Sequence, residues 1–257
     1  TRLLPAQPEL EFSHAQDPIL TSSFARNFAK TTLIAADIGV LTARRVRAEV
    51  GDRIQGIFGG PPCQGFSDIG RRDVDDPRRH LIGHFFRLVS EIEPDFFIME
   101  NVRGLAYRDS RTVLDEAIGQ LGDRYRLLGP LILDAADFGA ATKRRRLFVI
   151  GTHRERADRV DEAELKLFRK APATVRQAIG DLSAPRALDS LDDGFDRWKI
   201  GKLGRPSHYA AGLRSSDGIF TGHRIVNHKP DVKERFAAVP QGGMDKVGRH
   251  PRLDWNG

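Results

Sequence analysis

Short apolar runs, separated by turn residues and by one amphipathic segment, dominate the middle of the chain. Residues 54–60 (IQGIFGG) and 95–101 (DFFIMEN) are apolar runs of strand length, and each predicts a buried strand. Between them, residues 80–94 place apolar side chains at helical spacing and stop at Pro94, which predicts a helix. A strand, a helix and a second strand in this order predict two parallel strands.

The same pattern continues after the second strand. Residues 110–123 form an amphipathic stretch that predicts a helix, with Ser110 as its expected N-cap. Residues 125–140 and 145–152 predict two strands joined by a turn. Because strands and helices alternate from about residue 54 to 123, we predict an α/β fold with helices on both faces of a parallel sheet.

Beyond about residue 153 the apolar pattern weakens. Residues 152–170 are highly charged and are predicted to be helical, and residues 172–182 lead into stretches interrupted by Gly and Pro. We therefore divide the chain into residues 1–182 and a second, loop-rich region of residues 183–257.

Composition narrows the class of protein. The 257 residues include one cysteine, which excludes an internal disulfide and fits a reducing compartment. There is no apolar run of roughly 18 residues and no signal-like start, so we expect a soluble cytoplasmic protein without membrane contact. The chain has a net charge of +6, and its arginines are clustered, as in residues 143–146 (KRRR). Such clusters favour a polyanionic partner, although a solvated basic face is an equally open interpretation.

The single thiol, Cys63, lies in a loop of turn residues, GGPPCQGFSDIG (59–70), rather than among apolar neighbours. A phosphatase loop would need arginine where Ile69 stands, and a metal site would need partner ligands at a recognisable spacing. Covalent attack on an electron-poor carbon and a purely structural loop both stay open. Ligands of parallel sheets bind at the carboxyl ends of the strands, and both Cys63 and Glu100 are expected there.

Three ordered motifs carry a resemblance to a known family. Residues 61–67 (PPCQGFS) resemble the catalytic loop of the bacterial cytosine-C5-specific DNA methyltransferases, and Glu100-Asn101-Val102 matches that family's Glu-Asn-Val motif. Residues 136–151 are similar to its Gln-x-Arg-x-Arg segment, with Arg144 and Arg146 at the arginine positions. Further matches cover most of the chain: Asp17-Pro18 and residues 35–38, 172–182 and 250–255.

The resemblance implies a Rossmann-like, S-adenosylmethionine-dependent methyltransferase sheet with a smaller, loop-rich target-recognition region. Residues 1–182 would be the catalytic domain, incomplete at its N-terminus, and residues 183–257 part of the recognition region. The implied activity transfers a methyl group from S-adenosylmethionine to C5 of a cytosine flipped out of duplex DNA, through a covalent bond between Cys63 and C6.

Residue roles follow from the same resemblance. Cys63 would add to C6, Glu100 would bind N3 and the exocyclic amine, and Arg146 would contact O2, with Arg144 at the thiol loop or a phosphate. Asn101 is expected to brace the Pro-Cys loop at the substrate. The expected DNA-side residues are Pro62, Gln64, Ser67, Asn101 and Arg144, and the expected cofactor-side residues are Asp37, Ile38 and Pro61. Glu100 has a structural alternative, as a carboxylate at the strand end that caps a neighbouring helix. Asp37 has one too, as a residue that only forms a turn.

The chain also departs from the family pattern. Its first glycine is Gly39, so the family's glycine-rich cofactor loop does not precede Asp17, and Ala15 and Thr142 replace an acidic residue and a glutamine. The family's closing segment is not found either. We therefore expect a fragment, a split subunit with a complementing chain, or a degenerate relative, and we predict weak S-adenosylmethionine binding by this chain alone.

Other functions stay open at this point. One is a tRNA cytosine-C5 methyltransferase of the same superfamily, and another is a catalytically silent DNA-binding fragment. An enzyme resembling thymidylate synthase ranks last, because Gln64 rather than histidine follows Cys63. Candidate base or phosphate contacts in the second region are Arg205, His208, Arg214, His223 and Arg224.

Overall fold

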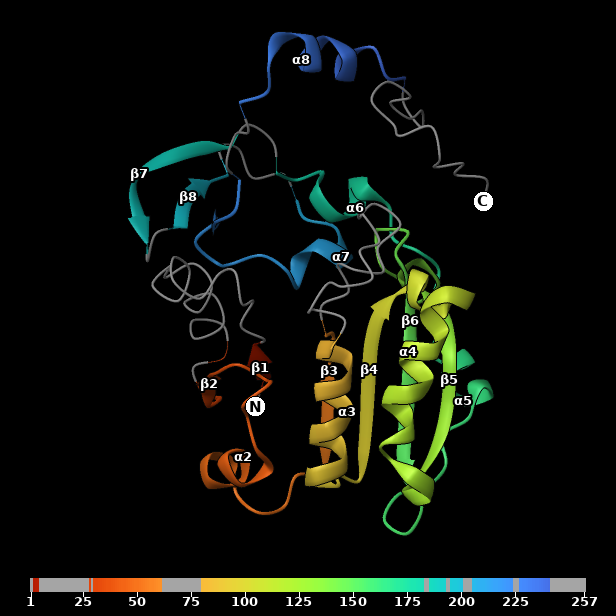
Figure 1. Ribbon diagram of the computed structural model, residues 1–257. Helices are drawn as coiled ribbons and strands as arrows, with labels where there is room; N and C mark the ends of the chain where they lie inside the picture. Colours follow the sequence, from red (N-terminus) through yellow and green to blue (C-terminus); the bar gives the residue numbers. More distant parts are fainter. Residues whose placement is uncertain are drawn as a thin grey trace.

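The largest sheet of the structure has four strands and is mixed (Figure 1). The structure is a computed structural model, and it describes residues 2–4, 28, 30–61, 80–182, 185–192, 195–200, 205–223 and 227–240. The strand order is β3-β4-β6-β5. The strands are β3 (Gly56–Gly59), β4 (Phe96–Val102), β5 (Tyr125–Asp134) and β6 (Arg145–His153). β3 and β4 are parallel, and β6 is antiparallel to both β4 and β5. β3, β4 and β5 therefore run in one direction, and the predicted strand–turn–strand segment inserts β6 between β4 and β5.

Helices α3 (His80–Ile92) and α4 (Arg108–Gly119) pack on the same face of this sheet. The core between them consists of fully buried side chains that include Phe86, Phe97, Met99, Leu114 and Leu147. Aromatic rings meet edge to face within it, with centroids 5.6 Å apart for Phe86–Phe97 and 5.3 Å for Phe97–Tyr125. Helix α3 begins and ends as its apolar spacing and Pro94 predict.

The opposite face of the sheet is apolar and only partly covered. Phe58 on β3 is 67% exposed and Phe96 on β4 is 38% exposed, and half-buried Ile98, Phe148 and Ile150 continue the same face. The prediction of helices on both faces is therefore wrong for the described residues. The physical reason is that β3, β4 and β5 follow one another in one direction, so successive right-handed crossovers place α3 and α4 on the same side.

A second, smaller core joins the N-terminal elements to α3. Strands β1 (Arg2–Leu4) and β2 (Leu33–Ala35) are parallel, and helix α2 (Ala43–Val50) follows them, capped by the Thr42 hydroxyl. Apolar side chains of this segment pack against Leu88 and Ile92 of α3, and they include Ile34, Leu41, Ala43 and Val46. Helix α3 thus contributes to both cores.

Several element boundaries differ from the predictions. Helix α4 begins at Arg108 with Tyr107 as its N-cap, because the short 3₁₀ turn η4 (Arg103–Ala106) leads directly into it and places Ser110 inside the first turn. Strand β5 ends at Asp134, where the 3₁₀ turn η6 (Ala135–Asp137) begins, and a further 3₁₀ turn, η5 (Gly122–Arg124), precedes β5. The charged segment 152–170 contains only one short helix, α5 (Glu162–Lys166).

The second region begins after helix α6 (Val175–Ile179). Its described residues form a three-stranded sheet of order β7-β8-β9 and two helices. Their bounds are β7 Arg186–Asp192, β8 Phe195–Lys199, α7 His208–Ala211, β9 Ile219–Phe220 and α8 Pro230–Ala237. Among the described helices, none has the length and apolarity that a membrane span requires.

Candidate active site

The predicted catalytic residues that the structure describes meet at one edge of the main sheet. Glu100 and Asn101 are among the last residues of β4. Pro61 follows β3, which is parallel to β4. Arg146 lies near the start of β6, where Val102 is its register partner. The carboxyl ends of β3 and β4 and the amino end of β6 therefore share this edge, as predicted for an α/β sheet.

Glu100 and Arg146 form an ion pair across the β4–β6 interface. The Arg146 Nε atom lies 3.1 Å from Glu100 Oε1, and the two side chains are 24% and 37% exposed respectively. Arg146 also donates a 2.8 Å hydrogen bond to the Arg145 carbonyl. Both side chains project from the sheet face opposite α3 and α4, so a carboxylate and a guanidinium group are offered together to a ligand at this edge.

The start of the Pro-Cys loop is tied to β4. The Asn101 side chain, 2% exposed, donates a 3.1 Å hydrogen bond to the Pro61 carbonyl, and its own oxygen accepts one of 2.8 Å from the Val102 amide. A Cβ atom on Gly60 would lie 3.0 Å from Glu100 Oε2, so glycine lets the loop backbone approach that carboxylate closely. This contact is the bracing expected of Asn101, and its predicted role at the substrate stays a prediction.

Four of the predicted residues lie outside the described parts of the chain: Pro62, Cys63, Gln64 and Ser67. Their expected roles therefore stay predictions. Pro61, which precedes them, is buried.

The basic segment 143–146 divides into two groups. Lys143, Arg144 and Arg145 are exposed, whereas Arg146 is half-buried against Glu100. Arg145 makes only a loose ion pair with Asp134, 3.5 Å from Nε to Oδ2. Of the four cations, Arg146 is the one held at the candidate site by a carboxylate.

On the predicted cofactor side, Asp37 and Ile38 begin the turn that follows β2. Asp37 Oδ1 accepts a 2.7 Å hydrogen bond from the Gly39 amide, so the turn-forming role of Asp37 is present in the structure. Ile38 is half-buried and packs against the second core. Whether either residue binds a cofactor stays a prediction.

The sequence patterns did not reveal Arg87, which holds this turn in place. Its guanidinium group donates to the Ile38 carbonyl at 2.8 Å and to the Leu41 carbonyl at 2.9 Å, and it pairs with Glu91 at 2.8 Å. Burial acts to raise the pKa of Glu91, but the hydrogen bonds from Arg87 and from the Ala43 amide lower it overall. The four-residue spacing of Arg87 and Glu91 was the only signal in the sequence, and it predicts the ion pair but not the loop.

The second region is anchored to α6 by Arg214. Its guanidinium group donates to both carboxylate oxygens of Asp181 at 2.8 and 2.7 Å and to the Ala178 carbonyl at 2.6 Å. The bond from Arg214 lowers the pKa of Asp181, whose side chain is 4% exposed. The structure thus pairs Arg214 with Asp181, and the DNA contact expected of Arg214 stays a prediction. Arg224 lies outside the described residues.

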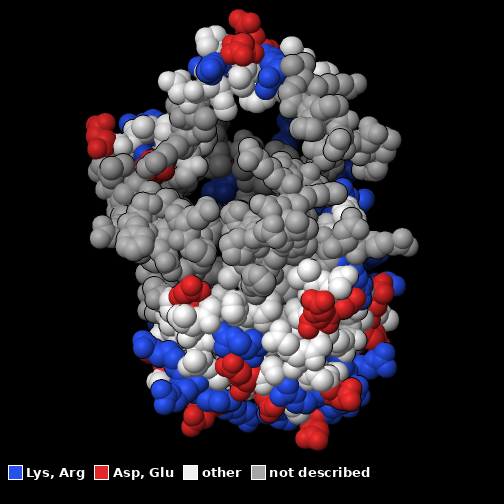
Figure 2. Space-filling model, viewed as in Figure 1, with Lys and Arg blue, Asp and Glu red and all other residues white. Residues whose placement is uncertain are grey.

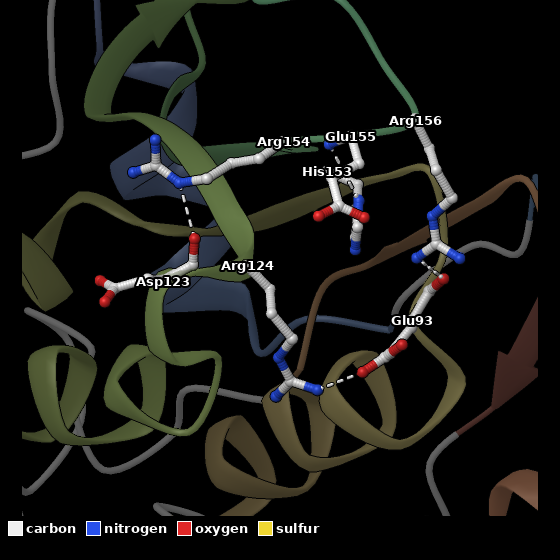
Figure 3. A pocket seen from close by; sticks show the side chains of 7 residues that line it. All are labelled: Glu93, Asp123, Arg124, His153, Arg154, Glu155 and Arg156. Carbon is white, nitrogen blue, oxygen red and sulfur yellow. Dashed lines mark hydrogen bonds and ion pairs between the residues drawn. The ribbon is translucent and has the colours of Figure 1, made fainter.

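A polar pocket of about 470 Å³ lies at the opposite end of the main sheet (Figure 3). Seven residues line it: Glu93, Asp123, Arg124, His153, Arg154, Glu155 and Arg156. Its arginines are bound by the chain itself, because Arg124 pairs with Glu93 at 2.5 Å and Arg154 donates to the Asp123 carbonyl at 2.6 Å. In the described parts of the chain, no group of three or more His, Cys, Asp and Glu side chains has the arrangement of a metal site.

Comparison with known proteins identifies relatives that match most of this chain. The family model "C-5 cytosine-specific DNA methylase" matches residues 6–212. The Type II methyltransferase M.XorII of Xanthomonas oryzae is 33% identical over 94% of this chain and 60% of its own length. M.DdeI of Desulfomicrobium norvegicum is 29% identical over 86% of this chain and 53% of its own length. The chain therefore spans between half and two thirds of these relatives.

A solved structure agrees with the sequence comparisons. One crystal structure is of a prophage-encoded E. coli protein that is described as a DNA modification methyltransferase. It superposes on this chain with a TM-score of 0.67 at 31% sequence identity. The match covers 92% of this chain and 70% of that one. The mixed α/β sheet and the second region are thus shared with a protein of this class.

Proposed function

Because this chain belongs to the C-5 cytosine-specific DNA methylase family, we propose that it carries out methyl transfer from S-adenosylmethionine to C5 of a flipped-out cytosine in duplex DNA. One observation carries the proposal. The Glu100–Arg146 ion pair stands next to the Pro61 carbonyl that Asn101 holds, so the acid, the base-binding cation and the start of the Cys63 loop share one edge.

Cytosine C5 is a weak nucleophile, and the proposed residues remedy this. The Cys63 thiolate forms a bond to C6, and the electrons of the C5=C6 double bond become available at C5. Glu100 binds N3 and the exocyclic amine, which stabilises the ring as sulfur adds, and Arg146 binds O2. C5 would take the methyl group from the sulfonium of bound S-adenosylmethionine, whose methyl–sulfur bond would break to leave S-adenosylhomocysteine. C5 then loses its proton to a base, the double bond re-forms and the thiolate leaves C6.

Arg146 also favours the reactive form of the thiol. A guanidinium group near the Cys63 loop would stabilise the thiolate over the neutral thiol. In the free protein, Glu100 partly neutralises Arg146. Binding of cytosine between them would redirect both groups to the base.

The described residues suit the adenine end of S-adenosylmethionine, which supplies an electrophilic methyl group when bound. Asp37 is half-buried in its turn and presents a carboxylate, an acceptor for the adenine amino group, and half-buried Ile38 beside it offers an apolar surface for the ring. Arg87 fixes the turn through the Ile38 and Leu41 carbonyls. Pro61, at the catalytic edge, is the third residue proposed to contact the cofactor.

Two features support duplex DNA as the substrate. The net charge is +6, and exposed Lys143, Arg144 and Arg145 flank the candidate site. Figure 2 shows that Lys and Arg intersperse with Asp and Glu over the lower half of one face, so neither sign of charge dominates there. Cations near the site would neutralise phosphates. The target base must leave the stack to reach the site.

The Type II names of the relatives support a role in a bacterial restriction–modification system.

The partly covered sheet face supports a complementing polypeptide. Parallel strands are normally covered on both faces, yet Phe58 is 67% exposed and β3 pairs with β4 alone among the described residues. A second chain with an apolar segment would cover this face. Replacing Phe58 with Glu should then abolish stimulation by such a chain while the thermal midpoint of this chain alone stays unchanged. If the second chain stimulates Phe58→Glu as strongly as it stimulates the wild-type chain, binding of a partner at this face is ruled out.

Methyl transfer from labelled S-adenosylmethionine tests the function. The chain is incubated with duplex DNA or with tRNA, alone and with a polypeptide that carries the remaining length of M.XorII. We expect label in 5-methylcytosine of the duplex, and no label with Cys63→Ala. Label in tRNA only would favour the RNA-modifying alternative, and label that persists in Cys63→Ala would exclude the covalent route.

A further inference from the structure

The segment that delivers Arg144 and Arg146 is a loop of ten residues, 135–144, between β5 and β6. Asp134, the last residue of β5, stands at its base. The side chain of Asp134 is 15% exposed, so it lies largely within the structure.

One carboxylate oxygen of Asp134 binds both ends of this loop. Oδ1 accepts a 3.1 Å hydrogen bond from the Ala136 amide and a 2.9 Å hydrogen bond from the Arg144 amide. Two backbone bonds close the loop beside it, from Ala135 to the Arg144 carbonyl and from Ala140 to the Ala135 carbonyl, both at 3.1 Å. Asp134 therefore determines where the chain leaves the loop and enters β6.

The entry point of β6 determines which way Arg146 faces. Asp134 is the register partner of Arg145, and Leu133 and Val102 are the partners of Arg146 on its two sides. In this register Arg146 Nε lies 3.1 Å from Glu100. Because side chains alternate across a strand, a slip of one residue would turn Arg146 to the other face and bring Arg145 to Glu100.

We propose that Asp134 is a positioning residue for methyl transfer, which fixes the loop 135–144 and the register of β6 and thereby holds Arg146 against Glu100 at the target base. The inference rests on the proposed function, in which Glu100 and Arg146 bind cytosine. Asp134 itself does not touch the base.

The two carboxylate oxygens of Asp134 contribute differently to holding the loop. Oδ1 accepts the two backbone hydrogen bonds, and these lower the pKa of Asp134. Oδ2 faces only Arg145, which is 56% exposed and 3.5 Å away, an arrangement of little energetic value. The acceptor at Oδ1, rather than the charge, is thus the feature that positions the loop.

This distinction gives a matched pair of variants. Asp134→Asn keeps an acceptor oxygen for the two amides and removes the charge, whereas Asp134→Ala removes both. Asp137→Ala is the control within the same loop, because the Asp137 carboxylate pairs only with Arg169, at 3.6 Å, with both side chains about half exposed.

The rate of covalent adduct formation is measured at saturating S-adenosylmethionine and saturating duplex DNA that contains 5-fluorocytosine. DNA affinity and hydrogen exchange of the Ala136 and Arg144 amides are measured as well. We expect Asp134→Ala to slow the adduct about a hundredfold, the usual cost of a displaced catalytic group. Its DNA affinity should change less than threefold, and both amides should exchange faster. Asp134→Asn and Asp137→Ala should stay within threefold of wild type in rate.

Three results would overturn the inference: an unchanged rate in Asp134→Ala, an equal loss in Asp134→Asn, or unchanged exchange at Arg144. A wild-type chain that forms no adduct, either alone or with the polypeptide carrying the remaining length of M.XorII, contradicts the proposed function instead. In that case the exchange experiment still decides the structural part, because protection of Arg144 that survives in Asp134→Ala rules out the role of Asp134.

Discussion

The side chain of Asn101 donates a buried 3.1 Å hydrogen bond to the carbonyl of Pro61, a residue 40 positions earlier in the chain. This bond joins the Glu-Asn-Val segment of β4 to the first residue of the Pro-Cys loop. It gives a physical reason why an amide follows the carboxylate of Glu100, since only a donor at this position can satisfy the Pro61 carbonyl.

Replacing Asn101 with Ala should release the start of the loop. The loss leaves a buried carbonyl without its donor, so we expect the free energy of unfolding to fall by about 1 to 3 kcal/mol. Urea denaturation measures this change. Gln120→Ala is the control, because Gln120 also binds a distant carbonyl, that of Gly83, but at the surface, and its effect should stay within about 0.5 kcal/mol. Equal losses in the two variants would contradict the tether.

Glu100→Gln should separate catalysis from stability. The Glu100–Arg146 pair is partly exposed, so its removal should cost at most about 1 kcal/mol of stability. The carboxylate is proposed to stabilise the attacked ring, so methyl transfer should fall by about a hundredfold or more. Thermal unfolding and single-turnover methylation measure the two effects. A variant as active as wild type would remove Glu100 from the mechanism.

Arg87→Met should loosen the turn that holds Asp37 and Ile38. The two carbonyls that Arg87 binds lose their donor, so the amides of residues 39–41 should exchange faster, and binding of S-adenosylhomocysteine, measured by calorimetry, should weaken. Arg45→Met is the matched control, since Arg45 pairs only with Glu49 at the exposed surface of α2. The prediction fails if the two variants behave alike.

Tyr125 should produce a distinct loss of stability at alkaline pH. Burial raises its pKa from 10.0 to about 12, and its hydroxyl donates a 2.8 Å hydrogen bond to the Pro94 carbonyl. A raised pKa in the folded state means that this contribution is fully present below pH 10 and is lost as the pH rises towards 12. The loss should reach about 2 to 3 kcal/mol.

Urea denaturation between pH 8 and 12 measures that loss. Tyr125→Phe should be less stable at neutral pH, because the Pro94 carbonyl loses its donor, but should lose less stability with rising pH than wild type. Parallel pH profiles for the two proteins would show that Tyr125 does not contribute.

Local patterns in the sequence predict the elements around the site well. The apolar spacing and Pro94 define α3, and apolar runs define β3 and β4, with Glu100 near the end of β4. These features depend on neighbouring residues, so they can be recognised without the fold. The family resemblance assigns Glu100 and Arg146 to the same base, and the structure brings their side chains within 3.1 Å, while their roles at that base stay a proposal.

Features that depend on contacts between distant segments could not be predicted. The antiparallel insertion of β6 between β4 and β5, and the placement of α3 and α4 on one face, follow from the strand order. Asp134 and Arg87 bind backbone groups, and backbone groups leave no trace in the residue pattern. Ser110 is not the N-cap that its sequence position predicts, because the preceding turn η4 leads directly into α4 at Arg108.

Covalent trapping at Cys63 tests the central claim most directly. The chain is mixed with S-adenosylmethionine and duplex DNA containing 5-fluorocytosine, alone and with the polypeptide carrying the remaining length of M.XorII, and denatured samples are examined by mass spectrometry. We predict an adduct on Cys63 in at least one of the two mixtures, and none with Cys63→Ala. The absence of an adduct in both mixtures, with DNA binding intact, would contradict the enzyme and leave a DNA-binding protein.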